Sequence, residues 1–359
     1  MDAARTVGGE LLSHRKVWPK PKGVRMTKAT TAVVATLALA GLLVSACAAP
    51  GDPLPSWNDG PTKQSITDFV DRVTDPASPD FVPEPERVAV FDNDGTLWAE
   101  QPLYFQLLFA LDRVRALADE RPEWRGRQPF QAILDDDQEA LRQLSLHDVM
   151  QVVMATHAGM TVDEFNRNVA DWLDTARHPR FDQPFPYMTY QPMLELLDYL
   201  RANGFKTFIV SGGGRDFLRV FAEERYGIPP EQVMGSMGQT AFEVWDEGPV
   251  LVKRPGIDFL DDKAGKPVGI HRFIGRRPIA AFGNSDGDLQ MLQWTAAGEG
   301  PSLMALVHHD DAEREWAYDR ESHVGRLDAA LDEAGERGWT VISMRDDWNR
   351  VFAFEEPSD

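Results

Sequence analysis

Short apolar, β-rich runs alternate with helical stretches along most of this 359-residue chain. The runs that read as buried parallel strands are 87–91, 206–210, 278–282, 303–307 and 340–344. Strands that alternate with helices predict a right-handed, doubly wound α/β fold with a parallel sheet. In such a sheet, ligands bind outside the carboxyl ends of the strands. The residues that directly follow each run are therefore the first candidates for a functional site.

Composition excludes some classes of protein and some kinds of binding partner. The chain has 37 Lys+Arg against 57 Asp+Glu, a formal net charge of -20 at pH 7, and 43% hydrophobic residues. A chain this long and this apolar can bury a full core, which excludes an intrinsically disordered protein. Nucleic-acid backbones are bound by clustered Lys and Arg. We therefore expect no nucleic acid among the partners of this protein.

The first 46 residues differ in charge from the rest of the chain. They hold seven basic and two acidic residues, and the stretch 29–46 that closes this segment has no charged side chain. A basic region followed by an apolar region is typical of an export signal peptide. We therefore predict a signal peptide over residues 1–46, with Met26 as an alternative start of translation.

The only cysteine, Cys47, directly follows the apolar region, in Val44-Ser45-Ala46-Cys47. This segment resembles the bacterial lipobox, in which a peptidase cuts before a cysteine that carries lipid. A diacylglycerol plus an N-acyl chain anchors a protein stably to a membrane. We predict lipidation of Cys47, a Pro- and Gly-rich tether over residues 47–64, and a place in the cell envelope outside the cytoplasm. An uncleaved membrane anchor and an incidental cysteine are the alternatives.

Two carboxylates follow the first predicted strand, in Asp92-Asn93-Asp94-Gly95-Thr96. Asp92 and Asp94 can face one small site if the backbone turns at Gly95, which tolerates such a turn. Such a pair can hold a hard divalent cation while one oxygen stays free to attack. The alternative is an ordinary Asx-rich turn.

Polar, glycine-containing segments also follow the next two predicted strands. Ser211-Gly212-Gly213-Gly214 leads into a predicted helix, and a hydroxyl with glycines at a helix N-terminus suits a phosphate group. A helix cap is the alternative, since Ser is a good capping residue. Gly283–Asp288 supplies further oxygen ligands at the same edge of the sheet. Three such motifs in this order, each at a strand end, are hard to obtain by chance.

Together these motifs resemble those of the haloacid dehalogenase-like (HAD) superfamily, particularly its phosphoserine phosphatase-like hydrolases. Asp92-x-Asp94-Gly95-Thr96 is similar to the first motif of the superfamily, Ser211 to the second, and Gly283–Asp288 to the fourth. The resemblance extends over residues 85–345. It implies a HAD Rossmann-like core and the chemistry of phosphoryl transfer, because the dehalogenases of the superfamily lack the second carboxylate.

The third motif of the superfamily is a lysine shortly before the fourth motif. Lys266 fits that spacing best, and Lys263 and Lys253 are weaker candidates. The resemblance implies that this lysine offsets negative charge on the nucleophile and on the transferring phosphoryl group.

The resemblance also implies a role for each of the other residues. Asp92 would attack phosphorus and form an aspartyl-phosphate. Asp94 would protonate the leaving alkoxide as general acid and then activate the hydrolytic water as base. Ser211 and the main-chain N–H of Gly212 would bind the phosphate oxygens.

The resemblance implies Mg²⁺ as the cofactor, with ligands from the first and fourth motifs. The carboxylate of Asp92 and the main-chain carbonyl of Asp94 would bind it together with Asn284, Asp288 and water. Most relatives have an Asp at the position of Asn284. An amide oxygen can still bind Mg²⁺ but brings no charge, so either the Mg²⁺ affinity is lower or Asp288 or Asp286 compensates.

The segment between the first two motifs, residues 98–205, is mostly of helical periodicity. An insert at this point looks like the C1 cap of the superfamily, a lid over the sheet edge that excludes water. The core would then comprise residues 65–97 and 206–359. Four aromatic residues near the catalytic loop are expected either to line a substrate pocket or simply to pack in the lid core. They are Trp98, Tyr104, Phe105 and Phe109.

Two further segments draw attention. His308-His309-Asp310-Asp311 resembles a metal cluster, but adjacent residues at a strand end point to opposite sides, which favours polar packing. The segment 242–252 is predicted to form a β-hairpin flap.

The sequence thus predicts an exported, lipid-anchored, Mg²⁺-dependent phosphomonoesterase that acts on a small phosphorylated metabolite. Phosphoserine and phosphocholine are the named substrates, and a choline head would need a cage such as Trp98, Tyr104 and Glu100. A phosphotransferase of the same fold is the first alternative. The second alternative is a non-catalytic envelope binding protein that has lost metal binding because it has Asn284 in place of an Asp. The sequence leaves the oligomeric state open.

Overall fold

The computed structural model describes residues 51–355, apart from the side chains of Gln138 and Leu146. The predicted signal peptide, the alternative start at Met26 and the lipidation site at Cys47 lie outside the described residues. Among the described residues no helix is long and apolar enough to cross a membrane.

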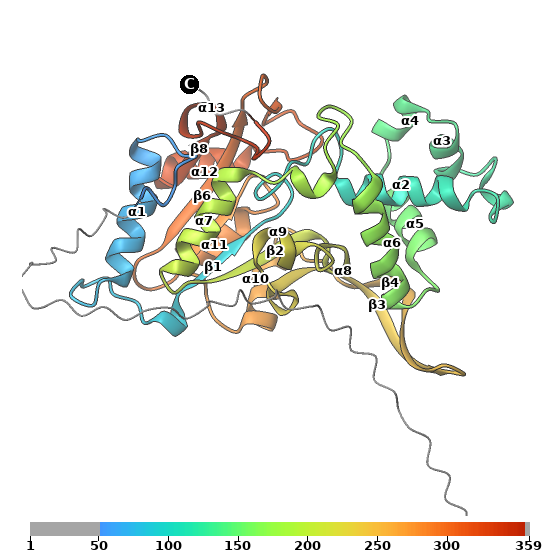
Figure 1. Ribbon diagram of the computed structural model, residues 1–359, viewed down its shortest axis with the longest axis horizontal. Helices are drawn as coiled ribbons and strands as arrows, with labels where there is room; N and C mark the ends of the chain where they lie inside the picture. The colour runs from blue at the N-terminus through green and yellow to red at the C-terminus, as the bar shows by residue number, and fades with distance from the viewer. Residues whose placement is uncertain (1–50, 356–359) are drawn as a thin grey trace, which may run out of the picture. The chain divides into compact units, whose positions relative to one another are not determined.

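A mostly parallel eight-stranded sheet forms the centre of the fold (Figure 1), with the strand order β4-β3-β2-β1-β5-β6-β7 and with β8 also paired to β6. Among the strands of residues 51–355, the β3–β4 and β6–β7 pairs are antiparallel and the other pairs are parallel. This architecture confirms the predicted doubly wound α/β class. The strands are β1 (Val88–Phe91), β2 (Lys206–Gly214), β3 (Val233–Trp245), β4 (Gly248–Phe259), β5 (Ala280–Gly283), β6 (Leu303–Asp310), β7 (Ala317–Tyr318) and β8 (Thr340–Ser343).

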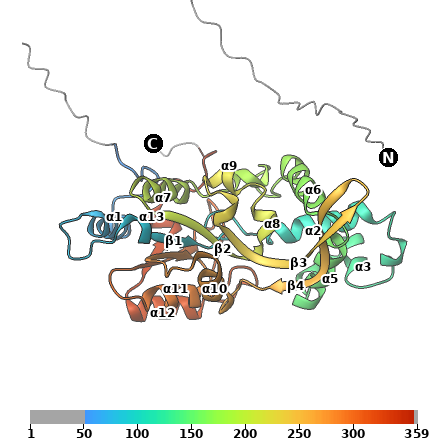
Figure 2. The same cartoon turned by 90° about the horizontal axis from the view of Figure 1, so that it is seen from below.

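Helices cover both faces of the sheet, with α1 and α7 on one side and α10, α11 and α12 on the other (Figure 2). The alternation along β1 shows how the core is divided. Ala89 and Phe91 belong to the apolar cluster of the α7 side, whereas Val88 and Val90 belong to the cluster of the α11 side. Because both faces are buried, β1 has to be apolar throughout, as its sequence is. The helices are α1 (Pro61–Thr74), α2 (Phe105–Leu117), α3 (Phe130–Leu134), α4 (Gln138–Arg142), α5 (Leu146–His157), α6 (Val162–Thr175), α7 (Gln191–Ala202), α8 (Arg215–Leu218), α9 (Ala222–Tyr226), α10 (Gly265–Gly269), α11 (Leu289–Ala296), α12 (Ala329–Arg337) and α13 (Met344–Asp347).

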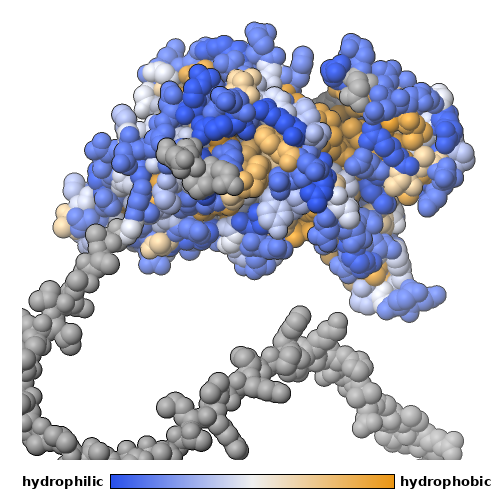
Figure 3. Space-filling view, turned by 45° about the horizontal axis from the view of Figure 1, so that its top comes forward, coloured by the Kyte–Doolittle hydropathy of each residue, from blue (hydrophilic) through white to orange (hydrophobic). Residues whose placement is uncertain are grey.

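Helices α2 to α6 form the inserted cap, beside the β3–β4 hairpin (Figure 1). Capping boxes start two of them, at Ser145 for α5 and at Thr161 for α6. The loop between these helices pairs with β4, because the N–H of Gly159 donates to the carbonyl of Lys253 and the N–H of Lys253 to that of Met160. The predicted hairpin is therefore present and is joined to the cap. In the space-filling view, apolar residues line a hollow between the cap and the rest of the fold (Figure 3).

The outer boundaries differ from those expected. Helix α7, which the sequence reading placed in the cap, packs on β2 and is part of the sheet's helical layer. The predicted tether also contributes to the core, because Leu54 and Trp57 are buried and the Trp57 ring packs edge-on against Trp348 at 5.8 Å. The cap boundary was predicted from helical periodicity, which does not show what a helix packs on, and the tether from its composition, although a Pro- and Gly-rich segment can still carry buried apolar residues.

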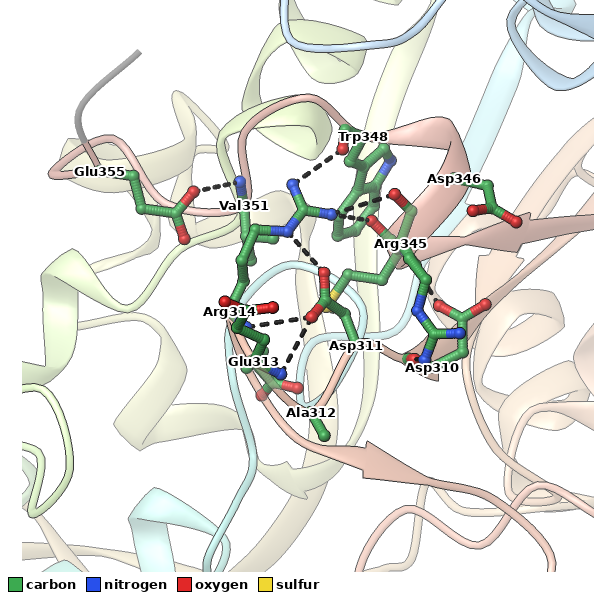
Figure 4. A network of polar contacts seen from close by, with 12 residues as sticks. Asp310, Asp311, Ala312, Glu313, Arg314, Arg345, Asp346, Trp348, Val351 and Glu355 are labelled. Atoms are coloured by element: carbon green, nitrogen blue, oxygen red, sulfur yellow. Dashed lines mark hydrogen bonds and ion pairs between the residues drawn. The ribbon is translucent and has the colours of Figure 1, made fainter. Parts of the chain in front are cut away.

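The C-terminal segment is fastened to the end of β6 by a polar network (Figure 4). The Arg314 guanidinium forms an ion pair with Asp311 at 2.5 Å and donates to the main-chain carbonyls of Trp348 and Met344 at 2.8 and 2.7 Å. Asp310 accepts a hydrogen bond from the Ser343 hydroxyl at 2.6 Å. The two aspartates of the His308–Asp311 segment therefore have structural partners.

Candidate active site

The three polar motifs meet at one edge of the sheet because their strands are neighbours. In the register, Phe91 at the end of β1 lies beside Ile209 of β2 on one side and Phe282 of β5 on the other. The N–H of Asp92 continues this pairing by donating to the carbonyl of Phe282 at 2.9 Å. Asp92 and Asn284 consequently follow the adjacent strands β1 and β5, while Ser211 lies in the last part of β2, which continues to Gly214.

Lys266 is the centre of the site's charge network. Its ammonium, 2% exposed, contacts Asp92 Oδ1 at 2.6 Å, Asp288 Oδ1 at 2.5 Å and the carbonyl oxygen of Val210 at 2.8 Å. Of the three lysines considered, only Lys266 contacts Asp92 in the described structure. Lys263 is exposed, and Lys253 pairs with Asp216 at 2.6 Å.

Burial dominates the electrostatics of this network. It raises the pKa of Asp92 well above its ordinary value, with further increases from Asp288 and Asp94, and Lys266 opposes the increase. For Lys266, burial alone would lower the pKa, but the charges of Asp288 and Asp92 raise it above the usual value. The ammonium is therefore locked in its charged form next to the candidate nucleophile.

Asp94 is held beside Asp92 by a tight turn. The Trp98 indole N–H donates to Asp94 Oδ1 at 2.9 Å, and burial raises the pKa of the carboxyl while that hydrogen bond lowers it. The turn needs Gly95, whose φ is 77° and whose Cβ, were one present, would lie 2.1 Å from Asn284 Nδ2. Trp98 itself is fully buried and stacks on Phe221 with ring centroids 4.6 Å apart.

Of the other aromatic candidates, two are buried and one is exposed. Phe105 and Phe109 are buried in the main apolar cluster, so they pack in the cap and its junction with the sheet. Tyr104 is 38% exposed, and its hydroxyl accepts the N–H of Gly325 at 3.2 Å. Of the four residues, Tyr104 is exposed and the other three are buried.

The candidate phosphate loop at the end of β2 is held from the cap side. Ser211 is fully buried, and its Oγ accepts the N–H of Gly213 at 3.0 Å. Gln106, near the start of α2, accepts the N–H of Gly214 at 2.7 Å and donates to the same residue's carbonyl at 3.3 Å. Sequence reasoning missed Gln106, because nothing in its local pattern separates it from any polar residue on a helix.

The fourth motif is arranged around Asn284 and Asp288. Asn284 Oδ1 accepts the Thr96 hydroxyl at 3.0 Å, and Nδ2 donates to Glu100 Oε1 at 2.7 Å. Asp288 Oδ2 accepts the main-chain N–H groups of Asn284 and Ser285, both at 3.0 Å, while its Oδ1 faces Lys266. Asp288 is thus engaged by the protein through both oxygens.

With the geometry established, comparison with known proteins places the chain in a family. The model of the family described as haloacid dehalogenase-like hydrolase matches residues 89–293, more than half of the chain. The chain belongs to this family. The HAD hydrolase domain predicted from the motifs is confirmed. No curated protein matches the sequence significantly.

Solved structures show the same broad similarity at low identity. A functionally unknown protein from Anaerococcus prevotii is 16% identical, with a TM-score of 0.49, over 78% of this chain and 90% of its own. A protein of unknown function from Bordetella pertussis is 15% identical, with a TM-score of 0.46, over 72% and 98%. A phosphoserine phosphohydrolase-like protein from Francisella tularensis is 16% identical, with a TM-score of 0.37, over 70% and 99%. Scores this low add nothing to the family assignment.

The donor set of this HAD hydrolase suits a hard divalent cation. Among residues 51–355 no three His, Cys, Asp or Glu side chains are grouped to hold a metal ion. Such a cation would instead use the Asp92 carboxylate, the Asp94 carbonyl and the Asn284 amide oxygen, which are all ligands that Mg²⁺ accepts. Glu100 is a further buried carboxylate near Asp94 and Asp92, and burial, with the charges of those two residues, raises its pKa well above the ordinary value. This excess of buried carboxylates fits a site that a divalent cation completes.

His309 is hydrogen-bonded to the loop that contains Asp92 and Asp94. It is 2% exposed, its Nε2 donates to the main-chain carbonyl of Gly95 at 2.8 Å, and its Nδ1 lies 3.2 Å from Glu315 Oε2. His308 lies on the other side of the strand end, 3.4 Å from Asp319. The expected alternation is therefore observed, and the two histidines do not form a metal cluster.

Asp261, five residues before Lys266, is a further buried carboxylate near the site. It is fully buried, and neither side-chain oxygen has a hydrogen-bond partner among the described residues. Burial raises its pKa from 3.8 to about 7, with Lys266 opposing the increase. In the unfolded chain the group ionises near pH 4, so ionisation of the unfolded state alone destabilises the fold from about pH 4 up to about pH 7.

We expect Asp261→Asn to leave stability unchanged at about pH 4 and to raise it by about 2–4 kcal/mol at pH 8. Urea unfolding across that pH range measures the difference, with the exposed Asp258→Asn as control. Parallel stability curves for wild type and Asp261→Asn would show that the carboxyl ionises normally in the folded protein.

Proposed function

We propose that this HAD hydrolase is a Mg²⁺-dependent phosphomonoesterase that works through an aspartyl-phosphate and acts on a small organic phosphate outside the cytoplasm. The observation that carries the proposal is the contact of Lys266 with Asp92 Oδ1 at 2.6 Å, beside Asp94 and near Ser211 in β2, the strand paired with β1. A nucleophile, a proton donor, a phosphate-binding hydroxyl and a fixed cation are what phosphoryl transfer requires.

In the first step, Asp92 attacks phosphorus. Because Oδ1 is engaged by Lys266, the other oxygen is the attacking atom, and Lys266 holds the carboxylate still while it does so. The Ser211 hydroxyl and the N–H of Gly212 bind the phosphate oxygens and stabilise the charge that develops on them. The Asp92 carboxylate, the Asp94 carbonyl and Asn284 would hold Mg²⁺, which would supply further charge neutralisation.

Asp94 handles the protons of both steps. Burial raises the pKa of Asp94, and the Trp98 indole N–H occupies Oδ1, so Oδ2 is the oxygen that would carry the proton. That proton passes to the leaving alkoxide as the P–O bond breaks. The resulting carboxylate then takes a proton from the water that attacks the aspartyl-phosphate, which releases phosphate and restores Asp92.

The structure bears on the choice between the two named substrates. A choline cage built from Trp98, Tyr104 and Glu100 would need open faces, yet Trp98 is fully buried and Glu100 is 1% exposed. Glu100 Oε1 accepts a hydrogen bond from the Asn284 amide, and the Trp98 indole N–H donates one to Asp94. The particular argument for phosphocholine is therefore lost, and both substrates belong in a panel of small organic phosphates.

Release of phosphate from p-nitrophenyl phosphate by the purified protein tests the proposal. We expect hydrolysis with Mg²⁺ and none after chelation. An added alcohol distinguishes the alternative phosphotransferase, since phosphate would then appear on the alcohol. Absence of hydrolysis with every divalent cation and with the whole substrate panel would favour the non-catalytic binding protein.

Replacing Asp94 by Asn tests the proton-transfer step. We expect Asp94→Asn to slow hydrolysis of alkyl phosphates by about 10²–10⁴-fold, because the leaving alkoxide then departs unprotonated. The loss should be much smaller for formation of the intermediate from p-nitrophenyl phosphate, whose leaving group needs no proton. Pre-steady-state measurement of nitrophenol and alcohol release compares the two. Equal losses for both esters would contradict a general-acid role.

Export and lipidation remain proposals of their own. Cys47→Ser should move the protein from the membrane fraction to the soluble envelope fraction, and the mass of the mature N-terminus should show cleavage before Cys47. A membrane-bound Cys47→Ser variant would favour the uncleaved anchor.

A further inference from the structure

Glu100 is buried between the first and the fourth motif. Its side chain is 1% exposed, and its Oε1 accepts hydrogen bonds from Asn284 Nδ2 at 2.7 Å and from the Tyr318 hydroxyl at 2.8 Å. Both hydrogen bonds that it accepts within the described residues end on that one oxygen. A carboxylate is thus held against the amide of a residue that bears no charge.

Two glycines make room for this carboxylate. A Cβ at Gly95 would lie 2.4 Å from Glu100 Oε1, and a Cβ at Gly325 would lie 1.8 Å from the same atom. Both glycines also have positive φ, 77° and 67°, which other residues rarely adopt. The Glu100 carboxylate therefore fits between the two loops only because Gly95 and Gly325 have no side chains.

The contact determines which way the Asn284 amide faces. Glu100 Oε1 is the acceptor for both Asn284 Nδ2 and the Tyr318 hydroxyl, so the NH₂ group of Asn284 points at Glu100. Its Oδ1 then lies on the opposite side, where it accepts the Thr96 hydroxyl at 3.0 Å. A carbonyl oxygen has a second lone pair, so Oδ1 remains able to bind a cation. The charge-assisted hydrogen bond also polarises the amide and makes that oxygen a better ligand.

We propose that Glu100 is a positioning residue for the divalent cation: it fixes the Asn284 amide with its oxygen available and supplies, through the hydrogen bond, the negative charge that Asn284 lacks. The inference rests on the proposed function, since it concerns the same cation site. Carboxylates that orient metal ligands in this way affect metal affinity strongly although they do not touch the metal.

The test is a charge swap between the two residues. We expect Glu100→Gln to weaken Mg²⁺ binding about 10- to 100-fold, measured by calorimetry on the full chain without substrate. In the double variant Glu100→Gln/Asn284→Asp, the amide donates to the carboxylate, so the same hydrogen bond forms with its direction reversed. The charge returns to the site, and the double variant should recover most of the lost affinity.

Tyr318→Phe is the matched control. It removes the other hydrogen bond to Glu100 Oε1 but leaves the carboxylate and its contact with Asn284, so Mg²⁺ affinity should change little. Thermal melting without metal gives a second readout. Glu100→Gln removes a buried charge and should not lower the melting temperature of the metal-free protein, while the stabilisation by added Mg²⁺ should shrink.

Two results would overturn the assignment. One is a Glu100→Gln variant that binds Mg²⁺ as tightly as wild type, which would make Glu100 a packing residue. The other is a double variant that binds no better than Glu100→Gln. Failure of the proposed function has a different signature, because it would appear as wild-type protein that neither binds Mg²⁺ nor hydrolyses any phosphate ester.

Discussion

The Asp92→Asn variant should release no phosphate above background, a loss of at least about 10⁴-fold. An amide oxygen is a poor nucleophile toward phosphorus, and the other carboxylate beside Lys266, that of Asp288, is engaged through both oxygens by Lys266 and the main-chain N–H groups of the fourth motif. The fold should survive, because Asn keeps an oxygen that can accept the Lys266 hydrogen bond, now 2.6 Å long. Burial raises the pKa of Asp92, so neutralising it also removes a charge whose burial is costly.

Phosphate release under saturating substrate measures the loss, with the melting temperature as a check on folding. Hydrolysis by Asp92→Asn at more than a few per cent of the wild-type rate would contradict the assignment of the nucleophile. A folded variant without activity supports it, whereas a general collapse of the fold would be visible in the melting curve.

Replacing Lys266 by Met should produce the largest loss of stability. The ammonium lies between two buried carboxylates, those of Asp92 and Asp288, with side chains 9% and 1% exposed. Met keeps the length but not the charge, so both carboxylates remain buried without a counter-ion. We expect a loss of about 3–5 kcal/mol at neutral pH, measured by urea unfolding.

The loss of stability in Lys266→Met should depend on pH, and its direction follows from the pKa of Asp92. Burial and Asp288 raise the pKa of Asp92, and the ammonium opposes them, so removing Lys266 raises that pKa further. A carboxyl with a raised pKa in the fold costs nothing at low pH, where it is protonated in both states. The deficit of Lys266→Met should therefore shrink on acidification. Activity should fall by about 10²–10³-fold as well.

Lys263→Met is the control, because Lys263 lies three residues before Lys266, just ahead of α10, and is exposed. It should change stability by less than about 0.5 kcal/mol. A Lys266→Met variant no less stable than Lys263→Met would contradict the charge network described here.

The sequence was informative where a local pattern maps directly onto the fold. Every apolar run interpreted as a strand is one, from Val88–Phe91 to Thr340–Ser343. Parallel pairing of β1 with β2 and β5 then brings the residues after them to one edge of the sheet. Asp92, Ser211 and Lys266 could be selected because strand ends and motif spacing are visible in one dimension.

The sequence was silent where a role depends on tertiary contact. Glu100 and Asn284 are 184 positions apart, and no pattern links them. Gln106 reaches the phosphate loop from the cap, and Trp98 turns its indole N–H toward Asp94 instead of lining a pocket. The boundary of the cap also depends on packing, since α7 has the same periodicity whether it covers the cap or the sheet.

The central claim is a phosphoryl group carried on Asp92, and mass spectrometry of acid-quenched protein tests it most directly. The Asp94→Asn variant is the protein to use, because without its base the intermediate should hydrolyse slowly and accumulate during turnover of p-nitrophenyl phosphate. We predict one added phosphoryl group on the peptide that contains Asp92, and none in an Asp92→Asn/Asp94→Asn double variant. A phosphoryl group on another residue, or its persistence in the double variant, would contradict this account.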